Sequence, residues 1–393
     1  MTGSPAEREV ARVLAQRTGT SPDDWYCVYR ERHGMLLAFE AVRETLGEGA
    51  VVTQLLTCCT AVDPILAAGL VPRYGELSAR TAALDPAALR LDATTRAVVI
   101  QHTYGIVDDA ASAELARRAH EAGALAVEDC AHCVGRMARD EGGEPVADVS
   151  FHSFGSGKML RTVVGGAVWV NPASPFAATA RALRERLAAL PASGRWLDVL
   201  EGAFINQNRL FNHIPRGVAM ALRHGLARLR LFEPAVSVEE LRGKVSHDPM
   251  RLSERLCRKA LDALAAVDET ERMCAAATEV LRAGLVGCPG VEVPAAALAG
   301  PAQPLLRLPV LVRDTSTSDR LIAAVRRAGY YTEPWYRPAL TPGVPDEGVY
   351  HVPADRSGVR VCDDFVARVT PLPTDRTEAE ARQIVDIVRE VCS

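Results

Sequence analysis

The sequence lacks the features that would place the protein in a membrane or on a nucleic acid. No run of 18 apolar residues suggests a membrane span, and the first ten residues are charged, without the apolar core of a secretory signal. Basic residues are not in excess, since 45 Lys and Arg stand against 49 Asp and Glu, so we expect no nucleic-acid partner. We find no internal repeat. These absences, with 48% hydrophobic and 24% charged residues, predict a cytoplasmic globular protein.

Disulfide bonds are not expected either, although the chain has ten cysteines. Without a signal peptide, cysteines in a chain of this length are typically reduced thiols. The close pairs are Cys58-Cys59 and Cys130-x-x-Cys133. The second pair resembles a redox or metal motif, but no second CxxC or His cluster in the sequence completes a site. We interpret these cysteines as small buried side chains and predict no metal.

The sequence does contain a regular alternation of short apolar runs with helical segments. Residues 35–47 have apolar positions at helical spacing and end on Gly47, a plausible helix C-cap. The runs that predict strands are AVVTQLL, VPRYGE, RAVVIQHTYG, ALAVEDC, VSFHSF and GGAVWVNP, with helices over PILAAGL and DDAASAELARRAHEAG between them. This pattern is typical of βαβ units. It predicts an α/β fold with a mostly parallel central sheet covered by helices on both faces.

The pattern changes near residue 250. Long helical segments follow residue 253, and then come the strand-like runs LLRLPVLV and ARVTPLP with the helix TSDRLIAAVRRAGY between them. The chain closes on the helical segment TEAEARQIVDIVREV. We therefore predict a large α/β domain over 1–250 and a smaller C-terminal α+β domain over 251–393.

Polar residues follow three of the predicted parallel strands. His102 and Tyr104 follow one, Asp129 and His132 follow the next, and the Ser153–Lys158 turn follows the third. In open parallel sheets, ligands bind outside the carboxyl ends of the strands. The sequence thus predicts a ligand site at this edge, with His102 and Tyr104 at its rim.

Two of these residues suit a specific chemistry. The charged form of Asp129, just after a buried strand, is disfavoured by burial unless it meets a cation such as a protonated pyridine nitrogen; capping a following helix is the alternative. Lys158, after a Gly-rich turn, can act as a nucleophile toward an aldehyde; an ordinary surface lysine is the alternative. A Walker-type phosphate loop is excluded, because Met159 stands where that motif needs Ser or Thr.

Together these residues resemble the DegT/DnrJ/StrS-type sugar aminotransferases, a family of fold-type I enzymes that use pyridoxal 5′-phosphate (PLP). The matching stretches are VEDCAHCVG, HSFGSGKML, GGAVWVNP and the His102-Thr103-Tyr104-Gly105 sequence. The resemblance implies that Lys158 carries PLP as a Schiff base and that Asp129 holds the pyridine nitrogen. It also implies that His132 lies near the phenolic oxygen and that Ser153 binds the phosphate.

The sequence departs from the family pattern at several supporting positions. The Gly-Thr that cradles the phosphate is Gly34-Met35 here, so only the backbone amides at the helix start are expected to bind. The aromatic residue that stacks on the cofactor falls at Cys58 if Thr57 is the matching Thr. The Asn that reaches the phosphate across a dimer interface is replaced near Pro249. The resemblance therefore indicates a divergent member.

The function that the resemblance implies is transamination. An amino-acid donor, usually glutamate in this family, would supply the amino group to a keto group of a sugar, nucleotide-sugar or aminocyclitol, in natural-product or surface-glycan biosynthesis. The enzyme would be a homodimer. The alternative is a PLP enzyme of the same fold with a dehydratase- or lyase-type reaction, or a non-catalytic regulatory relative.

An insertion over about 190–235 lies outside this resemblance. Val218, Leu222, Leu226 and Leu229 share one face of a predicted basic helix, which suits either a membrane surface or, as we favour, packing on a neighbouring subunit or domain. One hypothesis is that the insertion crosses the dimer interface and contacts the phosphate; the other is that it adds buried area or covers the active-site mouth. The candidates for the phosphate contact are Asn206, Asn208, Arg209 and Asn212.

Overall fold

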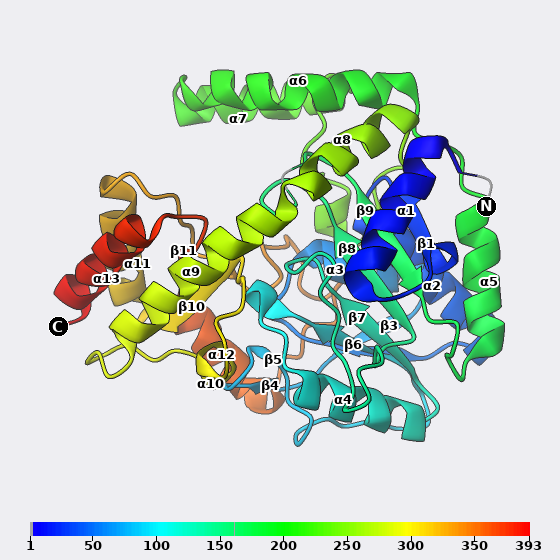
Figure 1. Ribbon diagram of the computed structural model, residues 1–393, viewed down its shortest axis with the longest axis horizontal. Helices are drawn as coiled ribbons and strands as arrows, with labels where there is room; N and C mark the ends of the chain where they lie inside the picture. The colour runs from blue at the N-terminus through cyan, green and yellow to red at the C-terminus, as the bar shows by residue number, and fades with distance from the viewer. Residues whose placement is uncertain (1–2, 161) are drawn as a thin grey trace.

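The computed structural model describes residues 3–160 and 162–393, and a seven-stranded sheet lies at its centre (Figure 1). The strand order is β1-β9-β8-β7-β6-β2-β3. The five strands from β8 to β3 pair in parallel, while β9 runs antiparallel to both β8 and β1. The strands are β1 (Trp25–Val28), β2 (Ala50–Thr53), β3 (Val71–Tyr74), β6 (Thr95–Gln101), β7 (Leu125–Asp129), β8 (Val149–Ser153) and β9 (Gly166–Val170). The predicted mostly parallel sheet is confirmed.

Helices cover both faces of this sheet, because alternate side chains of each strand point to opposite faces. Leu125 and Val127 of β7 pack with α2 and α5, whereas Ala126 packs with α4 on the other face. Trp169 of β9 joins a third cluster that α1 and α8 share. The helices are α1 (Pro5–Thr18), α2 (Glu31–Leu46), α3 (Cys59–Ala67), α4 (Asp109–Glu121), α5 (Ala177–Ala188) and α8 (Glu254–Ala265). The predicted coverage on both faces is confirmed.

Helix α2 begins four residues before the predicted start at residue 35 and ends, as predicted, at the Gly47 cap. Gly34 therefore lies inside the helix, where an added Cβ would come within 2.4 Å of Val168 Cγ2 on β9. The glycine is needed for close contact between α2 and the sheet. Gly34 and Met35 lie beyond the first turn of α2, where helix amides are bonded within the helix, and the phosphate contact at these two residues stays a prediction.

The C-terminal part is built on an antiparallel pair, β10 (Arg307–Leu311) and β11 (Val369–Pro373). Three helices pack around it, namely α9 (Val267–Leu285), α11 (Thr315–Arg327) and α13 (Glu378–Cys392). Shorter elements are β4 (Leu77–Ser78), β5 (Ala83–Leu84), α10 (Ala295–Leu298) and α12 (Arg360–Arg368). The boundary at residue 250 stays a prediction; α8 packs with the sheet's core, and the C-terminal core begins within α9.

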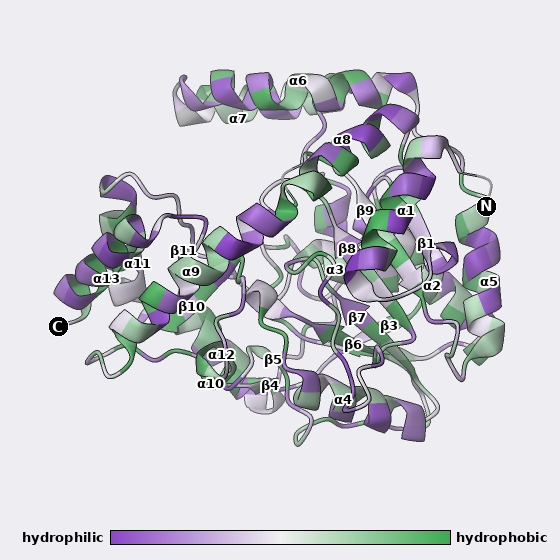
Figure 2. Ribbon diagram, viewed as in Figure 1, coloured by the Kyte–Doolittle hydropathy of each residue, from purple (hydrophilic) through white to green (hydrophobic). Residues whose placement is uncertain are grey.

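The insertion forms a helical hairpin of α6 (Arg195–Asn212) and α7 (Arg216–Arg228) that extends along one edge of the molecule (Figure 1). Phe204, Phe211 and Phe232 pack against one another inside it. Of the predicted apolar face, Val218 is 53%, Leu222 43% and Leu229 69% exposed. Figure 2 shows hydrophobic and hydrophilic residues interspersed along both helices. Among the described residues, no helix is long and apolar enough to cross a membrane.

The close packing of α2 gives a test with two helical glycines. Gly34→Ala should destabilise the protein by about 1–3 kcal/mol, because the methyl group meets Val168 and Phe151. Gly225→Ala in α7 should not destabilise it, since nothing lies within 4 Å of its added Cβ and alanine favours a helix. Urea denaturation of both variants measures the difference. Equal stability of Gly34→Ala and the parent would contradict the packing described.

Candidate active site

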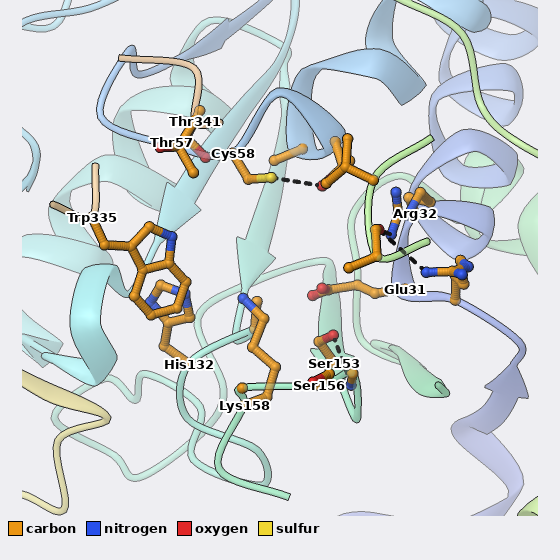
Figure 3. A pocket seen from close by; sticks show the side chains of 18 of the residues that line it. Glu31, Arg32, Thr57, Cys58, His132, Ser153, Ser156, Lys158, Trp335 and Thr341 are labelled. Carbon is orange, nitrogen blue, oxygen red and sulfur yellow. Dashed lines mark hydrogen bonds between the residues drawn. The ribbon is translucent and has the colours of Figure 1, made fainter. Parts of the chain in front are cut away.

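A cavity of about 440 Å³ opens at the carboxyl ends of β6, β7 and β8, and the C-terminal part closes it on the other side (Figure 3). It is the place where the sequence predicted a ligand site. Seven of the nine predicted site residues line it, namely Met35, Thr57, His102, Asp129, His132, Ser153 and Lys158. Gly34 and Tyr104 are not among its lining residues.

Lys158 extends into this cavity from the Gly-rich turn after β8 (Figure 3). The turn is closed by the Lys158 backbone N–H, which donates to the Gly155 carbonyl at 3.2 Å. Gly157 has φ of 79°, a conformation that favours glycine. The Lys158 Nζ lies 5.3 Å from the centre of the Trp335 ring, where a cation interacts favourably with the aromatic face. Lys158 is thus held in the cavity wall and is no ordinary surface lysine.

Asp129 is the last residue of β7 and is buried at the floor of the cavity. Its Oδ1 accepts the Ala131 N–H at 2.9 Å. Burial raises the pKa of Asp129, and the Ala131 amide and the charge of Lys158 oppose that rise. The residues that follow form turns, so the alternative of a helix cap is wrong. A buried carboxylate with one backbone partner is suited to meet a cation in the cavity.

His132 lines the cavity as a neutral ring beside Asp129 and Lys158. Its Nδ1 accepts the Tyr104 N–H at 2.9 Å, and its Nε2 lies 3.1 Å from the Tyr336 hydroxyl. Burial, followed by the charge of Lys158, lowers the pKa of His132 well below its usual value. The neutral ring with an accepting Nδ1 carries its proton on Nε2, which donates to Tyr336. The Tyr336 hydroxyl hydrogen is then available to another acceptor.

His102 lies at the end of β6, with Nε2 2.7 Å from Glu128 Oε1. Glu128 also accepts the Ala138 N–H and the Ser150 hydroxyl, so its buried charge is fully bonded. Burial alone would lower the pKa of His102, but the Cys133 sulfur and the Glu128 carboxylate raise it to about 9. This pair links the ends of β6 and β7, two of the strands from which the site residues project.

Tyr104 was predicted at the rim, but the structure places it beneath the cavity. It is fully buried, and its hydroxyl donates to the Trp335 carbonyl. Its ring lies 5.7 Å from that of Tyr336. Tyr104 therefore positions the Trp335-Tyr336 segment, because a bond to the backbone fixes where the two aromatic side chains begin.

The structure brings His102 to Cys130 and Cys133, with one ligand atom of each within 4.8 Å of the others. A single histidine, which the sequence did not reveal, thus joins the Cys130-x-x-Cys133 pair. Both sulfurs contact the Arg136 carbonyl oxygen, at 3.3 and 3.5 Å, and His102 is bound to Glu128. Structural zinc sites typically have four ligands, one more than this cluster offers. Both cysteines are fully buried, as predicted.

Three consecutive residues that the sequence analysis missed form another wall. Arg30 Nη2 pairs with Glu233 at 2.6 Å, and Arg32 Nη1 pairs with Glu240 at 2.5 Å. Glu31 points toward Ser153 and Lys158 (Figure 3), and its Oε1 is buried without a hydrogen-bond partner among the described residues. Burial and the nearby Asp129 carboxylate raise the pKa of Glu31 well above its usual value, which favours the neutral acid.

The insertion borders the cavity on the side of Arg30 and Arg32. Phe204 of α6 and the return segment after α7 line it, which supports the hypothesis that the insertion covers the active-site mouth. Two of the candidate phosphate ligands are engaged inside the hairpin, since Arg223 donates to Asn208 and Asn212 at 3.2 and 3.3 Å. Arg251, two residues after Pro249, pairs with Glu7 of α1 at 2.7 Å. A phosphate contact across a dimer interface stays a prediction.

Comparison with known proteins agrees with the resemblance. Residues 32–191 match the model of the DegT/DnrJ/EryC1/StrS aminotransferase family. The L-glutamine:2-deoxy-scyllo-inosose aminotransferase of Streptoalloteichus tenebrarius is 29% identical over 248 residues, which are 60% of this chain and 52% of that protein. The enzyme of the same name from Streptomyces lividus is 28% identical over 211 residues, which are 52% and 48% of the two chains. This chain thus spans about half the length of these curated relatives. The predicted resemblance is confirmed.

Solved structures match nearly the whole chain. A sugar aminotransferase from Micromonospora echinospora has a TM-score of 0.70 and 24% identity, and the match covers 98% of this chain and 92% of that one. NtdA from Bacillus subtilis, with bound cofactor PMP, has a TM-score of 0.69 and 15% identity and covers 99% and 78%. The 3-amino-5-hydroxybenzoic acid synthase has a TM-score of 0.70 and 18% identity and covers 99% and 91%. At these identities the matches confirm the predicted fold.

The buried His102–Glu128 pair gives a prediction about protonation. With a pKa of about 9, the His102 imidazole should stay protonated at pH 7–8. In Glu128→Gln the pKa should fall, because burial disfavours the charged ring once the carboxylate is gone. NMR titration of ¹³C-labelled histidine, assigned with a His102→Asn variant, measures this. His152, whose pKa burial lowers to about 4, is the internal control and should remain neutral throughout. A neutral His102 at pH 7 in the parent would contradict the pair as described.

Proposed function

We propose that this chain, whose residues 32–191 match the DegT/DnrJ/EryC1/StrS family, is a PLP-dependent aminotransferase. It would move an amino group from glutamate or glutamine to a keto group of a sugar or aminocyclitol. The observation that carries the proposal is that Lys158 and Asp129 line one cavity at the carboxyl ends of parallel strands. The names of the two curated relatives favour a cyclitol-type acceptor and glutamine as donor.

The residues around the cavity fit PLP at both of its ends. Lys158 offers the amine for covalent attachment, and Asp129 offers a buried carboxylate for the pyridine nitrogen. Ser153 and Ser156 offer hydroxyl groups for the phosphate. Glu31 fits there as a neutral acid, because its raised pKa lets it donate a hydrogen bond where a carboxylate would repel the phosphate. Its Oε1, which has no hydrogen-bond partner in the described part of the chain, is consistent with a bound acceptor.

When bound, PLP supplies the conjugated electron sink that stabilises negative charge on the substrate carbon. Lys158 Nζ would move the proton to and from the carbon that carries the amino group. Asp129 would keep the pyridine nitrogen protonated by its charge. The hydroxyl of Tyr336, oriented by His132, would donate to the cofactor's phenolic oxygen. Trp335 would shield the Lys158 amine from water, since its ring faces the Nζ.

We also propose that the enzyme acts as a cytoplasmic homodimer. All ten cysteines are free thiols in the structure, as expected in a reducing compartment. The exposed apolar side chains of α7 are suited to burial against a second subunit, the commonest partner of such surfaces being a symmetric copy.

The role of Lys158 can be tested by its replacement with alanine. The parent, loaded with PLP and reduced with borohydride, should retain the cofactor on the peptide that contains Lys158, as mass spectrometry would show. Lys158→Ala should lose both this label and turnover while its circular dichroism stays unchanged, because the turn adds little to the core. Replacement of the exposed Lys244 by alanine is the control. Turnover by Lys158→Ala at the parent rate would refute the assignment.

Asp129→Asn tests the carboxylate separately. The variant keeps the hydrogen bond from Ala131 but loses the charge that protonates the ring nitrogen, so the rate should fall by about 10²-fold or more. Cofactor loading, measured by absorbance after gel filtration, should fall much less. A rate within a few-fold of the parent would show that Asp129 only closes the turn.

A further inference from the structure

Among the described residues, three arginines line the cavity, and two of them are already bound to carboxylates by short ion pairs. Arg30 and Arg32 make ion pairs of 2.6 and 2.5 Å with Glu233 and Glu240, and all four side chains are largely buried. An arginine paired in this way has its charge and its paired N–H groups committed. Neither is therefore available to recognise an anionic substrate without breaking a buried ion pair.

Arg307 is bound differently. It is the first residue of β10, and it lines both this cavity and an adjacent one of about 280 Å³, as Lys158 does. Its Nη1 donates to the Leu306 carbonyl at 2.8 Å. Its nearest carboxylate among the described residues is Asp375, at 3.7 Å, which is beyond hydrogen-bonding distance. Glu333, which also lines the cavity, accepts the Tyr331 hydroxyl. Arg307 thus has a long ion pair of 3.7 Å with Asp375, whereas the pairs of Arg30 and Arg32 are 2.6 and 2.5 Å.

Arg307 belongs to the C-terminal wall of the cavity rather than to the wall proposed for the phosphate. Figure 3 shows Lys158 between Trp335 on one side and Ser153 and Glu31 on the other. Arg307 is grouped with the first side, since it begins β10 of the C-terminal part, the same part that supplies Trp335 to the cavity. An anion bound by Arg307 would therefore lie across Lys158 from the proposed phosphate contacts.

We propose that Arg307 binds the carboxylate of the amino-acid donor and so places the donor's amino group beside Lys158. The inference rests on the proposed function and adds the donor's subsite to it. The planar guanidinium fork matches a carboxylate in two parallel hydrogen bonds. A sugar or cyclitol acceptor carries hydroxyl groups and no carboxylate, so the same cation gives selectivity between the two substrates.

The test compares Arg307→Gln and Arg307→Lys with the parent, all loaded with PLP. The spectral change on adding L-glutamine or L-glutamate gives an apparent dissociation constant for the donor. That constant should rise about 10- to 100-fold in Arg307→Gln, the range expected for a charged hydrogen-bonded contact. Arg307→Lys keeps the charge without the fork and should fall between. Arg313→Gln, an exposed arginine just after β10, is the matched control and should behave as the parent.

A second readout does not depend on turnover. Glutarate should bind the PLP-free parent in a calorimetric titration, and Arg307→Gln should bind it at least tenfold more weakly. The acceptor's KM should not change by more than about twofold. A rise in the acceptor's KM alone, or a loss of PLP affinity alone, would overturn the proposal. Arg307 would then bind the acceptor or the cofactor instead of the donor.

The two readouts also separate this inference from the proposed function. If the parent responds to amino donors and Arg307→Gln responds with the same constant, the carboxylate site is wrong while the aminotransferase stands. If the parent responds to no amino donor, the proposed function fails. The glutarate titration then decides alone: binding that is lost in Arg307→Gln supports a carboxylate site, and equal binding refutes it.

Discussion

The buried hydrogen bond between His102 and Glu128 fixes the geometry on which the site depends. It joins the end of β6 to β7, while the Ser150 hydroxyl and the Ala138 amide bring β8 and the loop between β7 and β8 to the same carboxylate. A buried charge with three hydrogen-bond partners tolerates little movement, because each lost contact leaves the charge less compensated in a low-dielectric interior. The backbone position of Asp129, one residue beyond Glu128, is therefore fixed. The Lys158 turn follows the strand that Ser150 anchors.

Much of the fold could be predicted because each strand of the sheet leaves a local pattern in the sequence. Each buried parallel strand is a short apolar run, and the polar residue that ends it marks the site edge, so Asp129 and Lys158 were identifiable from the chain alone. Helix α2 shows the limit of such reasoning. Its first turn, Arg30 to Arg32, carries no apolar periodicity, and what holds it is pairing with Glu233 and Glu240, some 200 residues away.

The same limit explains the other missed residues. Arg307, Trp335 and Tyr336 enter the cavity from the C-terminal part, and their own neighbours in sequence give no sign of it. Nothing local distinguishes an arginine that starts a strand in a cavity wall from one in solvent. The aromatic pair in EPWYRP was a signal that could have been used, since adjacent aromatic residues beside a proline are unusual in a chain with 5% aromatics. Helix α1 and strand β1 were also missed, because their pairing partners, α8 and β9, are distant in the chain.

The α6–α7 hairpin is attached where it leaves and rejoins the body of the molecule, and the start of α6 also contacts α8 through Asp198 and Glu201. Before α6, Ser193 bonds to Arg251 and Ser253; after α7, Glu233 and Glu240 hold the return segment against Arg30 and Arg32. The loop-closure entropy of such an arrangement changes slowly with the number of residues between the anchors. The hairpin is therefore a module of adjustable length. A change in its length would alter what borders the mouth of the cavity, while the anchors at its two ends would keep the floor of the cavity in place.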